Sequence, residues 1–222
     1  MDDPLYFSKE STLTSIALSG WRHIELVVDR SASMVPIKAA TERGLRAFLA
    51  EQSHSDGLIT VSLTQFDHEV ELLYANCKLT QVPDFTLTPR GDTALLDAIG
   101  HTIARTRRFV RSVPKAYRPE EIITVVLTDG QENDSRAFDE SSVRALIDEQ
   151  RSKKRPWRFI LLGADETIHA LARRLSIDAQ TVIQYDHDRS EAVLASASQM
   201  ISRATRSGDY SFTEAERTAT RH

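Results

Sequence analysis

The chain has 222 residues, and its content of 41% hydrophobic and 27% charged residues is ordinary for one soluble globular domain with a sizeable core. Its 28 lysine and arginine residues against 32 aspartate and glutamate residues give a net charge of −4, so no overall positive charge draws it to nucleic acid or to an anionic membrane. No run approaches the roughly 18 apolar residues that a membrane span needs. We therefore expect neither a nucleic-acid partner nor a membrane partner.

Cysteine usage and the first residues bear on the compartment. Cys77 is the only cysteine, so this chain can form neither an internal disulfide nor a cysteine-based zinc site. The acidic start, residues 1–4, lacks the basic segment and long apolar stretch of a signal peptide. Both features predict a cytoplasmic protein. The seven histidines are scattered without HExxH spacing, so we interpret them as structural or surface residues rather than zinc ligands.

The first third of the chain alternates between strand and helix patterns. Residues 1–20 mix apolar residues with serine and threonine at no clean period, which predicts an irregular flank. The apolar run within 22–29 predicts a strand buried on both faces, and the spacing over 34–53 predicts a helix. Residues 58–66 alternate and are rich in β-branched side chains, which predicts a second strand, and residues 70–74 can return antiparallel as an edge strand.

The alternation continues to residue 206. Further helices are predicted at 95–110, 141–153, 167–175 and 191–206, and further strands at 121–127, 157–162 and 181–185. This order predicts an α/β fold with a doubly wound, mostly parallel sheet of six strands and helices on both faces. We expect one domain over 21–206, preceded by the flank 1–20 and followed by a polar, loosely held tail over 207–222, in which only Tyr210 and Phe212 can act as anchors.

Oxygen-bearing side chains follow two of the predicted strands and precede one predicted helix. They are Asp29, Ser31 and Ser33 after the first strand, Thr93 before the second helix, and Asp129 after the strand at 121–127. Carboxylates and hydroxyls are the hard ligands that Mg²⁺ prefers. Ligands of doubly wound sheets collect outside the carboxyl ends of the strands. The five residues therefore predict one metal site.

The same three segments carry a family resemblance. The pattern Asp-x-Ser-x-Ser, a distant Gly-x-Thr and a distant Thr-Asp-Gly together resemble the metal-ion-dependent adhesion site of von Willebrand factor type A domains. The resemblance extends over residues 20–206 in element order. It implies a Rossmann-like fold with strand order 3-2-1-4-5-6 and an antiparallel third strand. It also implies that Ser31, Ser33 and Thr93 bind the metal through their hydroxyls, while Asp29 and Asp129 act mainly through bound water.

A metal held mostly by neutral hydroxyls keeps much of its positive charge and can accept a carboxylate from another protein. We therefore predict a metal-dependent protein-interaction module rather than an enzyme, with Mg²⁺ as the ion and Mn²⁺ or Ca²⁺ as alternatives, and a partner that donates an aspartate or glutamate. The resemblance is to the intracellular, bacterial or phage-like type. Such members often work in multiprotein assemblies, including stress systems and complexes with ring ATPases.

Three alternatives stay open. The aspartate, serines and threonine can each cap a helix, since such side chains satisfy the free amides at a helix start. A metal beside a carboxylate can also activate water, as in a phosphatase-like hydrolase, although the sequence has no GxSxG turn and no phosphate-binding loop. The third is a conformational adaptor whose last helix moves when a partner binds.

Further residues near the predicted site, and two basic clusters away from it, also have expected roles. Arg30 and Met34 lie within the first turn, and we expect them to be exposed partner contacts beside the metal. Residues 132–135 either line the rim of the site or form a solvated loop. Two basic clusters, within 105–111 and 151–155, are interpreted as solvated helix faces and as cations at helix C-termini, with nucleic-acid binding as the lesser alternative.

Overall fold

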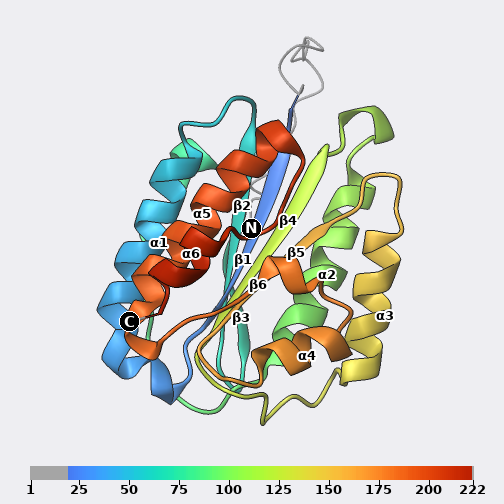
Figure 1. The fold of residues 1–222 in the computed structure, drawn as a ribbon. Coiled ribbons are helices and arrows are strands. Elements are labelled where there is room, and N and C mark those ends of the chain that lie inside the picture. The colour runs from blue at the N-terminus through green and yellow to red at the C-terminus, as the bar shows by residue number, and fades with distance from the viewer. Residues whose placement is uncertain (1–19, 222) are drawn as a thin grey trace.

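A six-stranded sheet runs through residues 20–221, which are the residues that the computed structural model describes (Figure 1). Its strands lie in the order β3-β2-β1-β4-β5-β6, and β3 alone among them is antiparallel to its neighbour. The strands are β1 (Arg22–Asp29), β2 (Ile59–Phe66), β3 (Val70–Lys78), β4 (Glu121–Thr128), β5 (Arg158–Gly163) and β6 (Val182–Gln184). The predicted fold class and strand order are confirmed. The irregular flank predicted for residues 1–20 lies almost entirely outside the described residues.

Helices cover both faces of this sheet, with α1 and α5 on one face and α2, α3 and α4 on the other (Figure 1). The α-helices are α1 (Lys38–Gln52), α2 (Leu95–Ser112), α3 (Glu140–Arg151), α4 (Ile168–Arg174), α5 (Ser190–Ser207) and α6 (Glu214–Ala219). Short 3₁₀ helices span Ala32–Ile37, Leu79–Gln81, Lys115–Tyr117, Ala179–Thr181 and His187–Arg189. None of the helices in the described range is long and apolar enough to cross a membrane.

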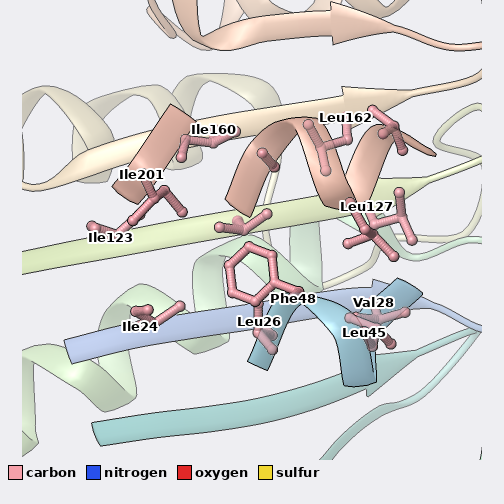
Figure 2. Packing of buried hydrophobic residues seen from close by; sticks show 14 of the residues in the cluster. Ile24, Leu26, Val28, Leu45, Phe48, Ile123, Leu127, Ile160, Leu162 and Ile201 are labelled. Atoms are coloured by element: carbon pink, nitrogen blue, oxygen red, sulfur yellow. The ribbon is translucent and has the colours of Figure 1, made fainter. Parts of the chain in front are cut away.

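Alternate residues of the central strand point into two separate cores. Ile24, Leu26 and Val28 pack toward α1 and α5, where Leu45 and Phe48 meet them (Figure 2). The intervening positions face α2. Full burial of an aliphatic or aromatic side chain stabilises the fold by about 1.5–3 kcal/mol. The sheet is therefore held from both sides, and its strand ends are rigid points from which side chains can be presented.

The α2 face of β1 is polar at two positions. His23 and Glu25 are fully buried there, and the Glu25 carboxylate accepts hydrogen bonds from Arg105 (2.5 Å) and from the Thr106 hydroxyl (2.5 Å) of α2. The His23 ring also lies 2.9 Å from this carboxylate. Burial alone would raise the pKa of Glu25, but the contacts with His23, Arg105 and Thr106 hold it below its ordinary value. Arg105, interpreted from the sequence as part of a solvated basic cluster, instead ties α2 to the central strand.

The prediction of a loosely held tail after residue 206 is wrong. Tyr210 and Phe212 are buried against the core on the α1 and α5 face, and the chain then forms α6 beside α5. A capping box starts this helix, because the Thr213 hydroxyl accepts the Glu216 amide (3.2 Å) and the Glu216 carboxylate accepts the Thr213 amide (2.7 Å). Two aromatic anchors and a satisfied helix start therefore hold the segment in place.

Candidate metal centre

The parallel pairing of β1 and β4 brings two carboxylates to one edge of the sheet. Val28 stands opposite Leu127 in the register, so Asp29 and Asp129 leave the two strands at neighbouring points. Asp29 is fully buried, and the side chain of Asp129 is likewise hidden from solvent. Both acids therefore share one desolvated space at the carboxyl end of the sheet.

Hydrogen bonds link four of the five predicted ligands into one chain. The Asp29 carboxylate accepts the Ser31 amide (2.7 Å), and the hydroxyls of Ser31 and Ser33 are 3.0 Å apart. The Ser33 hydroxyl then donates to the Asp129 carboxylate (2.8 Å). The second oxygen of Asp29 accepts the hydroxyl of Thr128 (2.6 Å). The turn after β1 and the turn after β4 are thus joined through their oxygen-bearing side chains.

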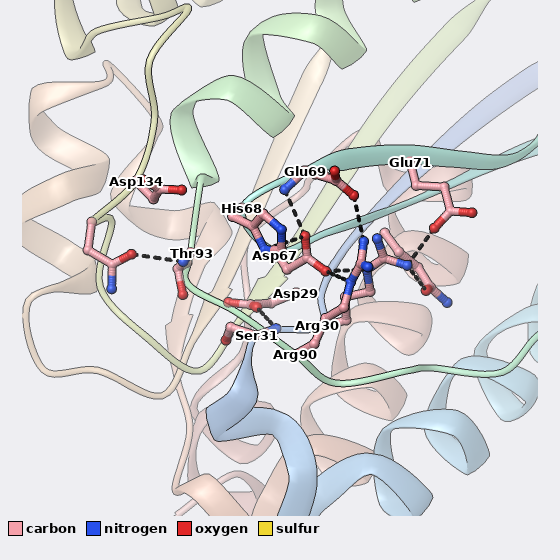
Figure 3. A network of polar contacts seen from close by, with 12 residues as sticks. Asp29, Arg30, Ser31, Asp67, His68, Glu69, Glu71, Arg90, Thr93 and Asp134 are labelled. Carbon is pink, nitrogen blue, oxygen red and sulfur yellow. Dashed lines mark hydrogen bonds and ion pairs between the residues drawn. The ribbon is translucent and has the colours of Figure 1, made fainter.

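The fifth predicted ligand, Thr93, lies across Gly130 from Ser33. A Cβ placed on Gly130 would stand 3.5 Å from the Thr93 hydroxyl oxygen and 3.9 Å from that of Ser33. The missing side chain of Gly130 leaves this space between the two hydroxyls open. Figure 3 shows Thr93 beside Asp29 and Ser31. The structure therefore brings all five residues to one place.

The loop after β4 positions Thr93 and the start of α2. The Asn133 side chain accepts the Thr93 amide (2.8 Å), and the Thr93 carbonyl accepts the Asn133 amide (3.0 Å). The Glu132 carboxylate accepts the Leu96 amide (2.9 Å), and the Ser135 hydroxyl accepts the Asp97 amide (3.0 Å). The sequence predicted residues 132–135 to be either the rim of the site or a solvated loop, and neither role describes these hydrogen bonds. They satisfy the free amides of a helix start.

The helix-cap alternative fails for two of the five residues. Ser31 stands at the N-cap position of the 3₁₀ helix Ala32–Ile37, but its side chain makes no capping bond. Ala94, not Thr93, is the N-cap residue of α2, and it too makes no side-chain cap. The hydroxyls of Ser31 and Thr93 are therefore not used to start these helices.

The electrostatics of the site favour a bound cation. Burial raises the pKa of Asp29 to about 6, and the charge of Asp129 adds to this, although hydrogen bonds from Thr128 and Ser31 act in the opposite direction. Within residues 20–221 neither carboxylate is paired with an arginine or a lysine. Two carboxylates and three hydroxyls are all hard oxygen donors, and the open space at Gly130 lies among them. This donor set fits a small divalent cation such as Mg²⁺.

His187 is a site residue that sequence reasoning missed. Its Nε2 lies 2.9 Å from the Asp129 carboxylate, and its side chain is 45% exposed. It belongs to the 3₁₀ helix His187–Arg189, just after β6. The signal was its position, because residues that follow any parallel strand reach the same edge of the sheet.

The expectation that Arg30 and Met34 contact a partner is wrong. Arg30 is buried, and its guanidinium pairs with Asp67 (2.9 Å) and Glu71 (2.5 Å) (Figure 3). Met34 is fully buried, as is Ile37, because a 3₁₀ helix brings every third residue to the same side. Val35, between them, is exposed instead (61%).

Asp67, His68 and Glu69 form a second group of metal-ligating side chains, with one ligand atom from each within 4.8 Å of the others. Arginines already neutralise it, because Arg90 binds Asp67 (2.8 Å) and Glu69 (2.6 Å) while Arg30 binds Asp67 (Figure 3). Although burial opposes it, the hydrogen bonds from Arg90 and the Glu69 amide, with the charges of both arginines, lower the pKa of Asp67. The group is a brace between loops rather than a second metal site.

Comparisons with known proteins place the fold. No family model matches the chain, and no curated protein matches it. Among solved structures it is similar to proximal thread matrix protein 1 from the mussel byssus, with a TM-score of 0.59, 15% identity, and coverage of 82% of this chain but 46% of that one. The chain thus spans about half the length of that protein, which is also solved with a zinc-occupied MIDAS motif (TM-score 0.59, 14% identity, 79% and 46% coverage).

Two further structures agree. The manganese-loaded TRAP protein of Plasmodium vivax has a TM-score of 0.55 at 16% identity, over 79% of this chain and 72% of that one. A von Willebrand factor type A structure from Catenulispora acidiphila has a TM-score of 0.54 at 15% identity, over 84% and 43%. At sequence identities this low, the similarity is evidence about the fold alone. Together with the six-stranded sheet, its order and its helices on both faces, they show that the chain has the Rossmann-like fold of von Willebrand factor type A domains.

Proposed function

We propose that this chain is a metal-dependent protein-interaction module. Ser31, Ser33 and Thr93 would bind Mg²⁺ through their hydroxyls, and Asp29 and Asp129 would balance its charge and hold its water. The observation that carries this proposal is the hydrogen-bonded chain from Asp29 to Asp129, with two buried carboxylates and no basic side chain paired to them in the described residues except His187. Structures of similar fold that are zinc-occupied or manganese-loaded support it, and Mn²⁺ and Ca²⁺ are alternative ions.

The proposed partner is a protein that donates an aspartate or glutamate carboxylate to the ion. Three hydroxyl ligands leave the ion's positive charge largely uncompensated, which favours an anionic ligand from outside. Val35 is exposed two residues after Ser33, and half-exposed His187 contacts Asp129, so these are the side chains that such a partner would meet. The cytoplasm is the proposed compartment, since Cys77 is half-buried in β3 and unpaired.

A calorimetric titration tests the metal site. Mg²⁺ and Mn²⁺ are titrated into metal-free protein, with and without acetate as a simple carboxylate. We expect one site, strengthened by acetate, whose affinity falls about 100-fold or more in the Ser31→Ala, Ser33→Ala double variant. The matched control is Ser152→Ala, Ser207→Ala, which removes two exposed serine hydroxyls elsewhere. Equal metal binding by both double variants, or no binding by the wild type with acetate present, would contradict the proposal.

A metal-dependent hydrolase is the second candidate, because His187 beside Asp129 resembles a general base near a metal. Phosphatase activity is measured with Mg²⁺ and Mn²⁺ on the wild type, Asp29→Ala and His187→Ala. We expect no activity that depends on these residues. Turnover that requires metal and disappears in both variants would favour the hydrolase over the interaction module.

A further inference from the structure

The two basic stretches of the sequence meet in space at the sheet edge opposite the metal centre. A cavity of about 470 Å³ lies between the C-terminal ends of α2 and α3, which pack side by side (Figure 1). Ile122, at the start of β4, and Trp157, just before β5, form part of its lining. The metal centre follows the other end of β4, which has 8 residues, so about 25 Å of strand separates the two places.

The cavity has an apolar floor and a cationic rim. Val110, Ile122 and Trp157 supply the floor. The rim holds seven cationic side chains and two carboxylates: Arg107, Arg111, Lys115, Arg118, Lys153, Lys154 and Arg155, with Glu120 and Glu149. In a chain of net charge −4, this is a strong local concentration of positive charge. Such a concentration raises the local density of anions.

Four of the seven cations have partners within the protein. Arg107 and Lys153 each pair with Glu149 at 3.0 Å. Arg118 donates to the Val113 carbonyl at 2.9 Å, and Arg155 donates to the Arg118 carbonyl at 3.2 Å. Ion pairing and the satisfaction of carbonyls near helix ends therefore account for these four side chains.

The other three cations are not accounted for in this way. Arg111, Lys115 and Lys154 are exposed, and none of them has a carboxylate partner among the residues that the structure describes. They come from the end of α2, the 3₁₀ helix Lys115–Tyr117 and the segment after α3. Three like charges gathered at one cavity repel each other, and an anion bound among them would relieve this repulsion.

We propose that this cavity binds a nucleotide, with its phosphates on Arg111, Lys115 and Lys154 and its base on the apolar floor. The volume lies in the range of small-molecule sites, about 300–1,000 Å³. Guanidinium and ammonium groups are the side chains that bind phosphate best. A flat base suits a floor that contains an indole. The site is independent of the proposed metal function, because it shares no residue with the metal centre and lies at the opposite edge.

Calorimetric titration of ATP into the protein tests this proposal. Excess EDTA is present, so that bound metal cannot mediate binding. The pocket variant Arg111→Gln, Lys115→Gln, Lys154→Gln removes the three unpaired cations. The control variant Lys78→Gln, Arg173→Gln, Arg206→Gln makes the same change of net charge at exposed positions elsewhere. We expect the wild type to bind one ATP per chain. The affinity for ATP should fall about tenfold or more in the pocket variant and change at most about twofold in the control.

Two further probes distinguish the sources of the nucleotide. Inorganic tripolyphosphate lacks a base, so we expect it to bind about tenfold more weakly than ATP. A short oligothymidylate that binds tighter than ATP, with the same loss in the pocket variant, would identify the end of a nucleic-acid strand as the source of the nucleotide. Oligothymidylate binding weaker than that of ATP would identify a free nucleotide as the ligand. Absence of ATP binding, an equal loss in the two variants, or tripolyphosphate binding as tight as that of ATP would each overturn the proposal.

Discussion

At the scale of single residues, Asp29 shows how the site depends on burial. It ends the central strand and accepts hydrogen bonds from Ser31 and Thr128, yet it also shares its space with the carboxylate of Asp129. Burial, to which the charge of Asp129 adds, raises its pKa to about 6, well above the ordinary 3.8. Because the folded protein holds this proton more tightly than the unfolded chain, ionising Asp29 costs stability when no metal is present.

This raised pKa predicts how Asp29→Asn changes stability with pH. The contribution of the protonated carboxyl group is complete below about pH 4 and is lost as the pH rises through about 6, a loss of up to about 3 kcal/mol. The asparagine variant has no such loss. In urea unfolding with EDTA, the free energy of unfolding of the variant should therefore rise relative to that of the wild type between about pH 4 and pH 7.5. In saturating Mg²⁺ the wild type should instead be the more stable protein.

The exposed neighbour Asp92 provides the control. We expect Asp92→Asn to follow the wild type within about 0.5 kcal/mol at every pH. Stability curves of wild type and Asp29→Asn that run parallel across this pH range would show that the Asp29 carboxylate is not desolvated as the structure indicates.

At the scale of the elements, β1 and α2 are joined by charge as well as by packing. A strand buried on both faces is normally apolar, but β1 carries Glu25 at its centre, and α2 supplies Arg105 to balance it. Removing one member of a buried ion pair leaves the other charged and unpaired, which costs more than the pair itself contributes.

We predict that Arg105→Met destabilises the fold by about 3 kcal/mol, because the buried Glu25 carboxylate loses its arginine partner and keeps only its contacts with His23 and Thr106. The double variant Glu25→Gln, Arg105→Met should be less destabilised than the single variant, since no unpaired charge remains. Urea unfolding measures both. Arg108→Met, on the exposed side of the same helix, is the control and should stay within about 0.5 kcal/mol. Additive losses in the double variant would contradict the pairing.

The segment after α5 provides a second test at this scale. Phe212 is 6% exposed and its amide donates to the Gln180 carbonyl (3.0 Å), so it anchors α6 to the body of the fold. Phe212→Ala should lower the free energy of unfolding by about 3 kcal/mol or more. Tyr117→Ala, which removes a half-exposed aromatic ring, should cost less than about 1 kcal/mol. Similar small losses in both variants would mean that the tail is not docked.

At the scale of the whole molecule, two candidate sites lie at opposite edges of one sheet. The carboxyl edge gathers acids and hydroxyls, and the amino edge gathers arginines and lysines. The rigid sheet between them separates the two sites by the length of β4. A partner at the metal and a nucleotide in the basic cavity would therefore not compete for the same surface.

Metal binding at the carboxyl edge should stabilise the whole fold by mass action. Mg²⁺ at about 100 times its Kd adds about 2.7 kcal/mol, which for a chain of this size raises Tm by roughly 5–10 °C. Thermal melting followed by circular dichroism, in Mg²⁺ and in EDTA, measures the shift. The Ser31→Ala, Ser33→Ala variant should show almost none. A shift of equal size in that variant would place the stabilising ion elsewhere.

The amino-acid sequence by itself determined the strands and the main helices up to residue 206, their order and the residues at the strand ends. β1 begins and ends at Arg22 and Asp29, as its apolar run predicts, because periodicity and β-branching act between residues close in the chain. The sequence also allowed the five candidate donors to be chosen, because each directly follows a predicted strand or precedes a predicted helix, and parallel strands end at a common edge. These donors are Asp29, Ser31, Ser33, Thr93 and Asp129.

Only the tertiary structure decided which side chains meet. Local sequence patterns do not predict contacts between segments far apart in the chain. Such contacts bury Met34, pair Arg30 with Asp67, bring His187 to Asp129 and dock Phe212. The basic cavity shows this most clearly, because net charge is an average over the chain. Arginines and lysines about 40 residues apart become one site only when α2 and α3 pack side by side.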